Sequence, residues 1–193
     1  MSNTTTEQVQ PHWPNRLITE LSNSDQSFTA LALGLSEPQL NWQPDSSRWS
    51  IGQILDHLRI TNESYLPPLS AALSNAPHSP VEEIHPGFFG AFFLRKFVEP
   101  STETKPVPAP GKIKPHSRVG TEVLALFLSV NESTRHLIIR ARDANVNRIR
   151  FWNPIVPGIR FTVGTGLQII SSHERRHLLQ AERVKNSPDF PAK

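Results

Sequence analysis

The sequence contains no cysteine and only one methionine and one tyrosine among its 193 residues. Without cysteine there is neither a disulfide framework nor an internal thiol nucleophile, which fits a protein of the cytoplasm. No apolar run approaches the roughly 18 residues of a membrane-spanning helix. Residues 1–10 are polar, lack Lys and Arg, and include no apolar segment of the kind found in secretory signals. We therefore expect a cytoplasmic protein with no membrane partner.

Strong charge of one sign is also missing, because the net charge is only +3. The charge is divided unevenly: residues 1–117 carry 8 basic and 11 acidic side chains, and residues 118–193 carry 12 and 6. The arginines of the second part are not interleaved with aromatic residues, which argues against a nucleic-acid groove. A solvated basic face is the favoured interpretation, and a site for a small anionic molecule is the alternative. We expect no nucleic-acid partner.

Helical periodicity is what the sequence has in abundance. The length suits one domain, so we expect residues 1–193 to form a single domain whose first 12 residues are a flexible polar N-terminus. Apolar residues recur at helical spacing in four segments, which are residues 15–35, 51–73, 121–142 and 162–185. This pattern predicts an all-α fold, and specifically a four-helix bundle.

Capping residues and prolines refine the predicted helices. Ser50 and Gln53 form a capping box that starts the second helix. Pro67-Pro68 is expected to bend or interrupt that helix. The fourth helix begins near Thr162 or Thr165, where Thr165 and Gln168 make a second box. In the third helix, the core face of Val123, Phe127, Val130, Leu137 and Ala141 is widened by Leu126 and Ile138.

A long proline-rich excursion separates the second and third helices. Residues 77–117 contain 8 prolines, which exclude a long helix or a central strand. Within it, residues 87–97 hold 5 phenylalanines and predict a short buried helix. This helix is interpreted as an aromatic cover over a site, as a segment that packs on the bundle, or as a membrane-surface contact beside Arg95 and Lys96. Residues 143–161 form a second loop that has room for a short extended piece.

Two histidines on the fourth helix are the first candidates for chemistry. His173 and His177 lie four residues apart, and therefore on one helical face. At about 100° per residue, both fall inside an apolar stripe formed by Val163, Ile170, Ala181 and Val184. Three arginines are expected to point away from this face, namely Arg175, Arg176 and Arg183. Unpartnered buried imidazoles cost roughly 1–3 kcal/mol each, so a buried pair would share a metal ion or bond to carbonyls and hydroxyls. Two half-exposed rings at the edge of a helix are the other alternative.

The literal pattern His173-Glu174-x-x-His177 is also the zinc-metalloprotease signature, in which the glutamate is the general base. A third ligand normally follows downstream in such proteases. Only Glu182 and Asp189 follow here as candidates, which argues against a protease.

A third ligand from upstream is available in His57, seven residues after Ser50. His57 lies at the edge of the apolar face of the second helix. In a four-helix bundle, an edge position can turn inward between neighbouring helices. His57 is therefore an eligible third ligand, and an exposed helix histidine is the alternative.

Several segments together resemble the DinB-like family. They are Leu-Asn-Trp-Gln-Pro at residues 40–44, the tryptophan-flanked capping box and histidine at residues 49–58, the histidine pair at residues 173–181, and the loop at residues 105–110. The resemblance implies a four-helix bundle in which His57, His173 and His177 hold a divalent metal. Imidazole ligands suit zinc, nickel or iron. Related proteins of known activity include transferases and isomerases that use low-molecular-weight thiols such as bacillithiol, mycothiol or glutathione.

The resemblance implies a metal-dependent enzyme that transfers a low-molecular-weight thiol to an electrophilic small molecule. Since the chain has no cysteine, the sulfur must arrive as a cosubstrate. The alternatives are a metal-dependent hydrolase that activates water and a non-catalytic metal-binding stress protein. Glu174 is predicted either to act as a base in hydrolysis or to orient a ligand histidine by a hydrogen bond.

Apolar residues beyond the four helical faces point to a homodimer. They include Trp13, Phe151, Trp152, Ile155, Val156 and the phenylalanines of residues 88–97. Large apolar patches on a soluble chain usually mark partner surfaces, and identical chains most often pair about a two-fold axis. The alternative is a monomer whose loops fold back over the open end of the bundle as a lid.

Overall fold

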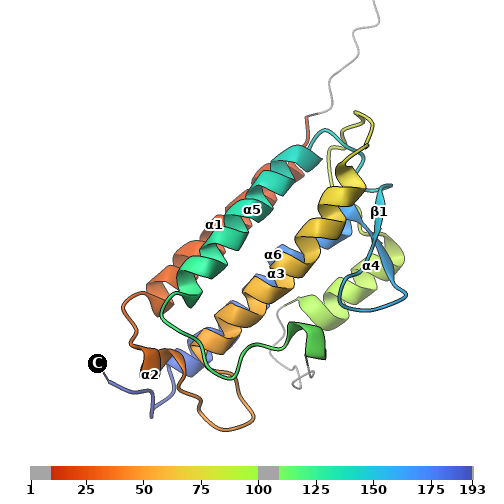
Figure 1. Ribbon diagram of the computed structural model, residues 1–193. Helices are drawn as coiled ribbons and strands as arrows, with labels where there is room; N and C mark the ends of the chain where they lie inside the picture. Colours follow the sequence, from red (N-terminus) through yellow and green to blue (C-terminus); the bar gives the residue numbers. More distant parts are fainter. Residues whose placement is uncertain (1–9, 100–108, 193) are drawn as a thin grey trace, which may run out of the picture.

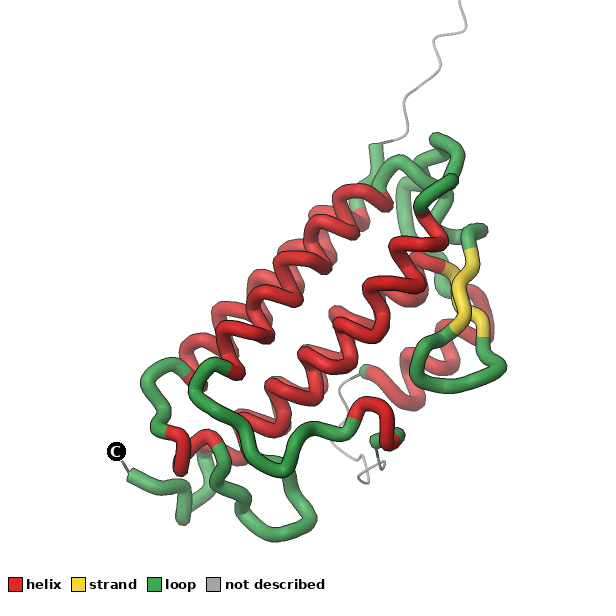
Figure 2. The backbone as a smooth tube through the Cα atoms, in the orientation of Figure 1, coloured by secondary structure: helices red, strands yellow, loops and turns green. Residues whose placement is uncertain are grey.

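The computed structural model describes residues 10–99 and 109–192. Four long helices form a bundle (Figure 1): α1 (Trp13–Ala32), α3 (Ile51–Leu73), α5 (Val123–Ala141) and α6 (Val163–Lys185). Helix α3 packs on α5 and α6, and α1 packs on the same two helices. The smooth tube of Figure 2 shows the shorter elements and loops gathered at the ends and along one side of these helices. The predicted all-α four-helix bundle is confirmed.

The apolar stripes of the four helices meet in two buried clusters. One surrounds Trp13, Tyr65 and Leu167, and the other surrounds Phe28 and Phe127, whose ring centroids are 5.2 Å apart. Full burial of such a side chain contributes about 1.5–3 kcal/mol, so these clusters supply most of the driving force for the bundle. Leu126, which was expected to widen the core face of α5, is instead 46% exposed. Among the residues that the structure describes, no helix covers the edge of α5 on which Leu126 lies.

Capping explains where the first helices begin and end. Helix α1 is followed by Gly34, whose φ of +77° favours glycine. Ser36 and Gln39 then form a capping box, and Glu37-Pro38 opens a short helix, α2 (Glu37–Leu40). The proline sits in the first turn, where a backbone N–H is not required. These four residues are too few to show a helical period, so α2 was not among the predicted helices.

The capping box predicted at the start of α3 is confirmed. The backbone N–H of Gln53 donates to Ser50 Oγ at 3.1 Å, and that of Ser50 donates to Gln53 Oε1 at 3.1 Å. Helix α3 then continues through Pro67 and Pro68 to Leu73, so the prolines do not interrupt it. Each proline removes one backbone hydrogen bond, and the buried face of Tyr65, Leu69 and Leu73 holds the remaining turns on the bundle.

The proline-rich excursion contains α4 (Gly87–Phe93), the π-helical turn η1 (Leu94–Val98) and the 3₁₀ turn η2 (Gly111–Ile113). The predicted short helix exists, but the prediction that it is buried is wrong, since Phe88 is 93% exposed. Only the side of Gly90, Leu94 and Val98 is buried. The other side faces solvent because no part of the described bundle covers it. Residues 105–108 of the loop that resembles the DinB-like family lie outside the described residues.

The second loop contains an antiparallel hairpin, β1 (Arg150–Trp152) and β2 (Arg160–Thr162), in which Phe151 pairs with Phe161. Strand β2 leads directly into α6, whose N-cap is Thr162, with its hydroxyl oxygen accepting from the backbone N–H of Thr165 at 3.2 Å. The expected start near Thr162 is therefore correct. The second capping box at Thr165 and Gln168 is wrong, because Thr165 already lies in the first turn. Residues 1–9 of the predicted flexible N-terminus lie outside the described residues.

Candidate metal centre

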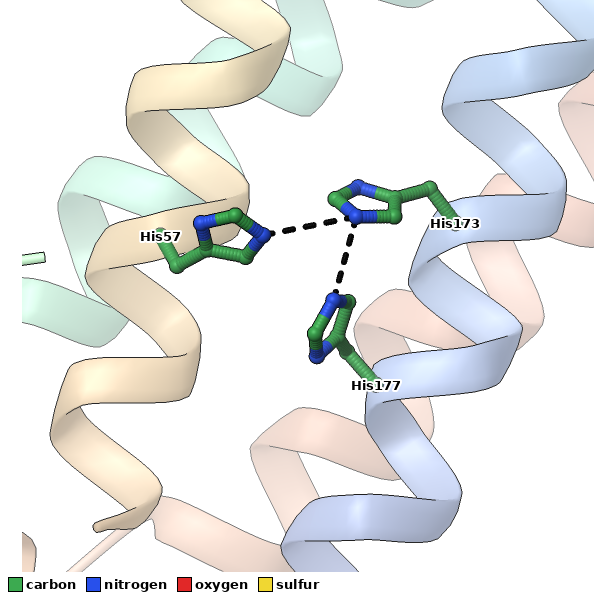
Figure 3. Close-up of side chains that lie close together, drawn as sticks. All are labelled: His57, His173 and His177. Atoms are coloured by element: carbon green, nitrogen blue, oxygen red, sulfur yellow. Dashed lines mark hydrogen bonds between the residues drawn. The ribbon is translucent and has the colours of Figure 1, made fainter. Parts of the chain in front are cut away.

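Three imidazoles converge between α3 and α6. His57 projects from α3 toward His173 and His177 on α6 (Figure 3). The Nε2 atom of His173 lies 3.3 Å from that of His57 and 3.0 Å from that of His177. One ligand nitrogen from each ring lies within 4.8 Å of the other two. His57 is 2% exposed, so it faces inward and is not the exposed helix histidine that was the alternative.

Hydrogen bonds at the far side of two rings fix their tautomers. His57 Nδ1 lies 2.6 Å from the carbonyl oxygen of Ile113, and His177 Nδ1 lies 2.8 Å from Gln180 Oε1. Both partners can only accept, so each Nδ1 carries the proton and donates it. The Nε2 atoms of His57 and His177 then carry no proton, and their lone pairs face His173. Lone pairs directed at a common point form the donor set of a shared cation.

Burial keeps these rings neutral. It lowers the pKa of His57, and it lowers the pKa of His173 well below the usual value, with His177 and His57 adding to the effect. Burial and the neighbouring His57 together lower the pKa of His177 to about 3. Neutral imidazole is the form that binds metal ions, so the local environment favours the metal-binding state at neutral pH.

The loop segment whose Ile113 carbonyl bonds to His57 is anchored to α3 near its start. Asp56 Oδ2 accepts from the backbone N–H of His116 and from its Nδ1, both at 2.8 Å. Burial raises the pKa of Asp56, but hydrogen bonds from His116 and Arg59 outweigh it and keep the pKa below its usual value. This anchored segment places the Ile113 carbonyl opposite the His57 ring.

The indole ring of Trp49, which comes just before α3, packs over two of the histidines. The ring of Trp49 lies 4.7 Å from that of His57 and 5.9 Å from that of His177, centroid to centroid. Because Trp49 directly precedes the Ser50 cap, the residue that begins the helix also places this apolar cover. It limits how far His57 and His177 can rotate out of the cluster.

Glu174 lies in a different environment, at 0% exposure in the centre of the bundle. Its carboxylate accepts from Asn62 Nδ2 at 2.8 Å and from Asn131 Nδ2 at 3.2 Å. Burial raises its pKa to about 7. Within residues 10–99 and 109–192, no hydrogen bond joins Glu174 to an imidazole. The two roles expected for it, base and partner of a ligand histidine, stay predictions.

The histidines open onto a cleft of about 1100 Å³. Its described lining includes Phe89, Phe92 and Phe93 of α4, but not Phe88 or Trp152. Arg176 and Arg183 also line it, so the expectation that they point away from the histidine face is wrong. They lie beside the histidine pair on α6, and the cleft that they line is also lined by residues of α4 and of the loop between β1 and β2.

Some contacts of the centre leave a signal in the sequence and others leave none. Gln180 follows His177 by three residues, a spacing that puts both on one helical face and predicts their contact. The Ile113 acceptor is a backbone carbonyl, which has no residue-type signature. Asn62 and Asn131 lie on helices distant in sequence, and only the packed bundle brings their amides to Glu174.

Fold and site together define a helical bundle with an inward-facing three-histidine cluster, of the class that builds metal sites between facing helices. The sequence model of the DinB superfamily matches residues 20–181, and the chain belongs to this superfamily. It is also 26% identical over 154 residues to the "Uncharacterized protein YuaE" of Bacillus subtilis (strain 168), an alignment that covers 79% of this chain and 86% of the relative. No solved structure gives a significant match. None of the described helices combines the length and the hydropathy needed to cross a membrane.

Proposed function

We propose that this protein is a metal-dependent enzyme that transfers a low-molecular-weight thiol to an electrophilic small molecule. The observation that carries the proposal is the set of three neutral imidazoles whose Nε2 atoms converge at the wall of an open cleft. His57, His173 and His177 would hold a divalent zinc, nickel or iron ion. When bound, such an ion would supply a Lewis acid that lowers the pKa of a thiol or water beside it.

The residues of the chain hold this donor set in place and admit substrate to it. Ile113 and Gln180 fix two rings, and the cleft gives access to them. In the proposed reaction the cosubstrate sulfur forms a bond to the electrophilic carbon, the bond to the leaving group breaks, and the thiol proton passes to solvent. The chain supplies no sulfur nucleophile of its own, because it has no cysteine.

Glu174 is proposed as a positioning residue that acts through the helices. Its carboxylate ties α6 to α3 through Asn62, which lies five residues after His57. His173 is the neighbour of Glu174 on α6, so this bond fixes the spacing of the two helices that carry the ligands. The carboxylate is buried and is not among the residues that line the cleft. This favours a positioning role over that of a base in hydrolysis.

Elemental analysis of untagged protein tests the metal centre. We expect close to one divalent metal per chain after reloading, and less than about 0.1 would refute the site. His177→Gln should lose the metal, whereas His136→Gln, on an imidazole that is 71% exposed, should retain it.

Turnover then separates the candidate functions. A haloaromatic substrate should be consumed only when a thiol is added, and only by the metal-loaded protein. Ester cleavage without thiol would support a metal-dependent hydrolase instead. A metal-loaded protein with neither activity on a panel of thiols and electrophiles would support a non-catalytic metal-binding stress protein.

A cytoplasmic homodimer is proposed as the working form. Phe88 and Trp152 are 93% and 60% exposed, and they belong to α4 and β1, beside the cleft. Light scattering at micromolar concentration should give twice the chain mass of 21.7 kDa. Phe88→Ser should shift the mass toward the monomer, and Leu33→Ser, at a position that is 71% exposed on the end of α1, should not. A mass of one chain that does not change on concentrating would refute the dimer and favour the lid.

A further inference from the structure

The cleft beside the histidines has cationic side chains and no anionic ones among its described lining residues. Arg48, Lys114, Arg176 and Arg183 line it, and no Asp or Glu does within residues 10–99 and 109–192. Arg48 is paired on the surface with Asp45 at 3.0 Å. The other three have no carboxylate within salt-bridge distance in the described part of the chain. Positive charge collected in a cleft with apolar walls attracts anions.

Much of the remaining lining of the cleft is apolar and aromatic. Helix α4 contributes Phe89, Phe92 and Phe93, and the loop between β1 and β2 contributes Ile155 and Val156. Figure 1 shows α4 and this hairpin next to each other on one side of the bundle. Phe89 stacks on the hairpin residue Phe161 and Phe93 packs on it at a tilt, with ring centroids 5.8 and 4.9 Å from that of Phe161. These ring contacts hold the wall in a fixed position facing α6.

Arg176 is the cation of the cleft whose charge acts on the histidines. It lies between His173 and His177 in sequence and is close enough to affect both rings electrostatically. One guanidinium N–H donates to the backbone carbonyl of Glu99 at 3.3 Å, which fixes the side chain at the end of η1. Since a guanidinium has five N–H donors, most of them remain for a ligand in the cleft.

We propose that this cleft binds an amphipathic organic anion, whose anionic group pairs with Arg176 beside the histidines and whose apolar part lies against the α4 wall. The inference builds on the proposed function, because it names the class of molecule that the same site accepts. Charge and apolar surface in the same cleft select for both properties in one ligand. A neutral apolar molecule would leave Arg176 unpaired, and a small inorganic anion would leave the phenylalanines without a partner.

A matched pair of fluorescent probes tests this inference. 8-Anilinonaphthalene-1-sulfonate carries a sulfonate, and N-phenyl-1-naphthylamine has the same aromatic system without the charge. Arg176→Gln should weaken binding of the sulfonate by about tenfold or more and change binding of the neutral probe less than about twofold, because charge-assisted hydrogen bonds are the stronger kind. Arg176→Lys should restore part of the loss. Arg148→Gln removes the same charge from an exposed site outside the cleft and should have no such effect.

A second pair of variants locates the apolar part. Phe92→Ala, in the cleft wall, should weaken both probes, and Phe88→Ala, outside the cleft lining, should weaken neither. Equal losses for the two phenylalanine variants, or for Arg176→Gln and Arg148→Gln, would overturn the proposal. So would equal losses of both probes in Arg176→Gln. Metal content is measured in the same samples: metal without Arg176-dependent probe binding refutes this inference alone, and probe binding without metal refutes only the proposed metal-dependent function.

Discussion

The buried carboxyl of Glu174 makes a specific prediction about stability. Its side chain is fully enclosed, and burial raises its pKa from 4.5 to about 7. Below pH 4.5 the group is protonated in both the folded and the unfolded protein. Between pH 4.5 and 7 the unfolded chain loses this proton first, so the folded state loses stability as the pH rises. The pKa difference corresponds to about 3 kcal/mol in the free energy of unfolding.

Glu174→Gln isolates this contribution, because glutamine has nearly the same shape and does not titrate. The three histidines change stability in the opposite direction, since their lowered pKa values make them destabilising as the pH falls below 6.5. Both proteins contain these histidines, so their effect cancels in the difference. The difference in free energy of unfolding between variant and wild type should shift by about 3 kcal/mol in favour of the variant between pH 4.5 and 8.

Urea denaturation at several pH values, on protein freed of metal by chelation, measures this difference. Chelation is needed because metal binding to the adjacent histidines is itself linked to pH. Glu182→Gln removes a carboxylate from the exposed side of the same helix and controls for the change in net charge. A difference between Glu174→Gln and wild type that is constant over this pH range would refute the reasoning.

Three further predictions concern the metal centre and the helix that carries His57. A metal ion at 100 times its dissociation constant should raise the free energy of unfolding of the wild type by about 2.7 kcal/mol but leave His177→Gln unchanged, as denaturation with and without chelator will show. Gln180→Leu removes the acceptor of His177 Nδ1, so a chelator-dye competition should show metal affinity about 10–100-fold weaker; unchanged affinity would mean that this bond does not orient the ring. Ser50→Ala removes one bond of the capping box of α3 and should lower the urea-derived stability by about 1 kcal/mol, and no change would contradict the role of the cap.

The bundle was predictable because its information is local. A 3.6-residue period and a capping box are properties of short segments, and both were read correctly at Ser50 and Gln53. The exposure of Leu126 and of Phe88 was not predictable, because an apolar residue at the right period is buried only if another element covers it. That depends on where the loops fold, which the helical pattern does not encode.

The candidate site shows the same division. The pair of histidines on α6 follows from spacing alone. The helical pattern made His57 an eligible third ligand, and the resemblance to the DinB-like family selected it. Angle counting put Arg176 and Arg183 outside the core, which is correct for the bundle. It could not show that α4 and the β hairpin enclose a cleft on that same side, and so turn an outward position into a lining position.

The three ligand candidates differ in what holds them. His173 and His177 share one helix, so their spacing survives any change that leaves α6 folded. The orientation of His57 depends on the carbonyl of Ile113, and therefore on a loop segment anchored to α3 by Asp56 and His116. This segment lies beside the cleft, with Ile113, Lys114 and Pro115 among its lining residues. Movement of this one segment would thus reorient the third imidazole and reshape the cleft wall together, which couples the completeness of the histidine cluster to the shape of the space that receives substrate.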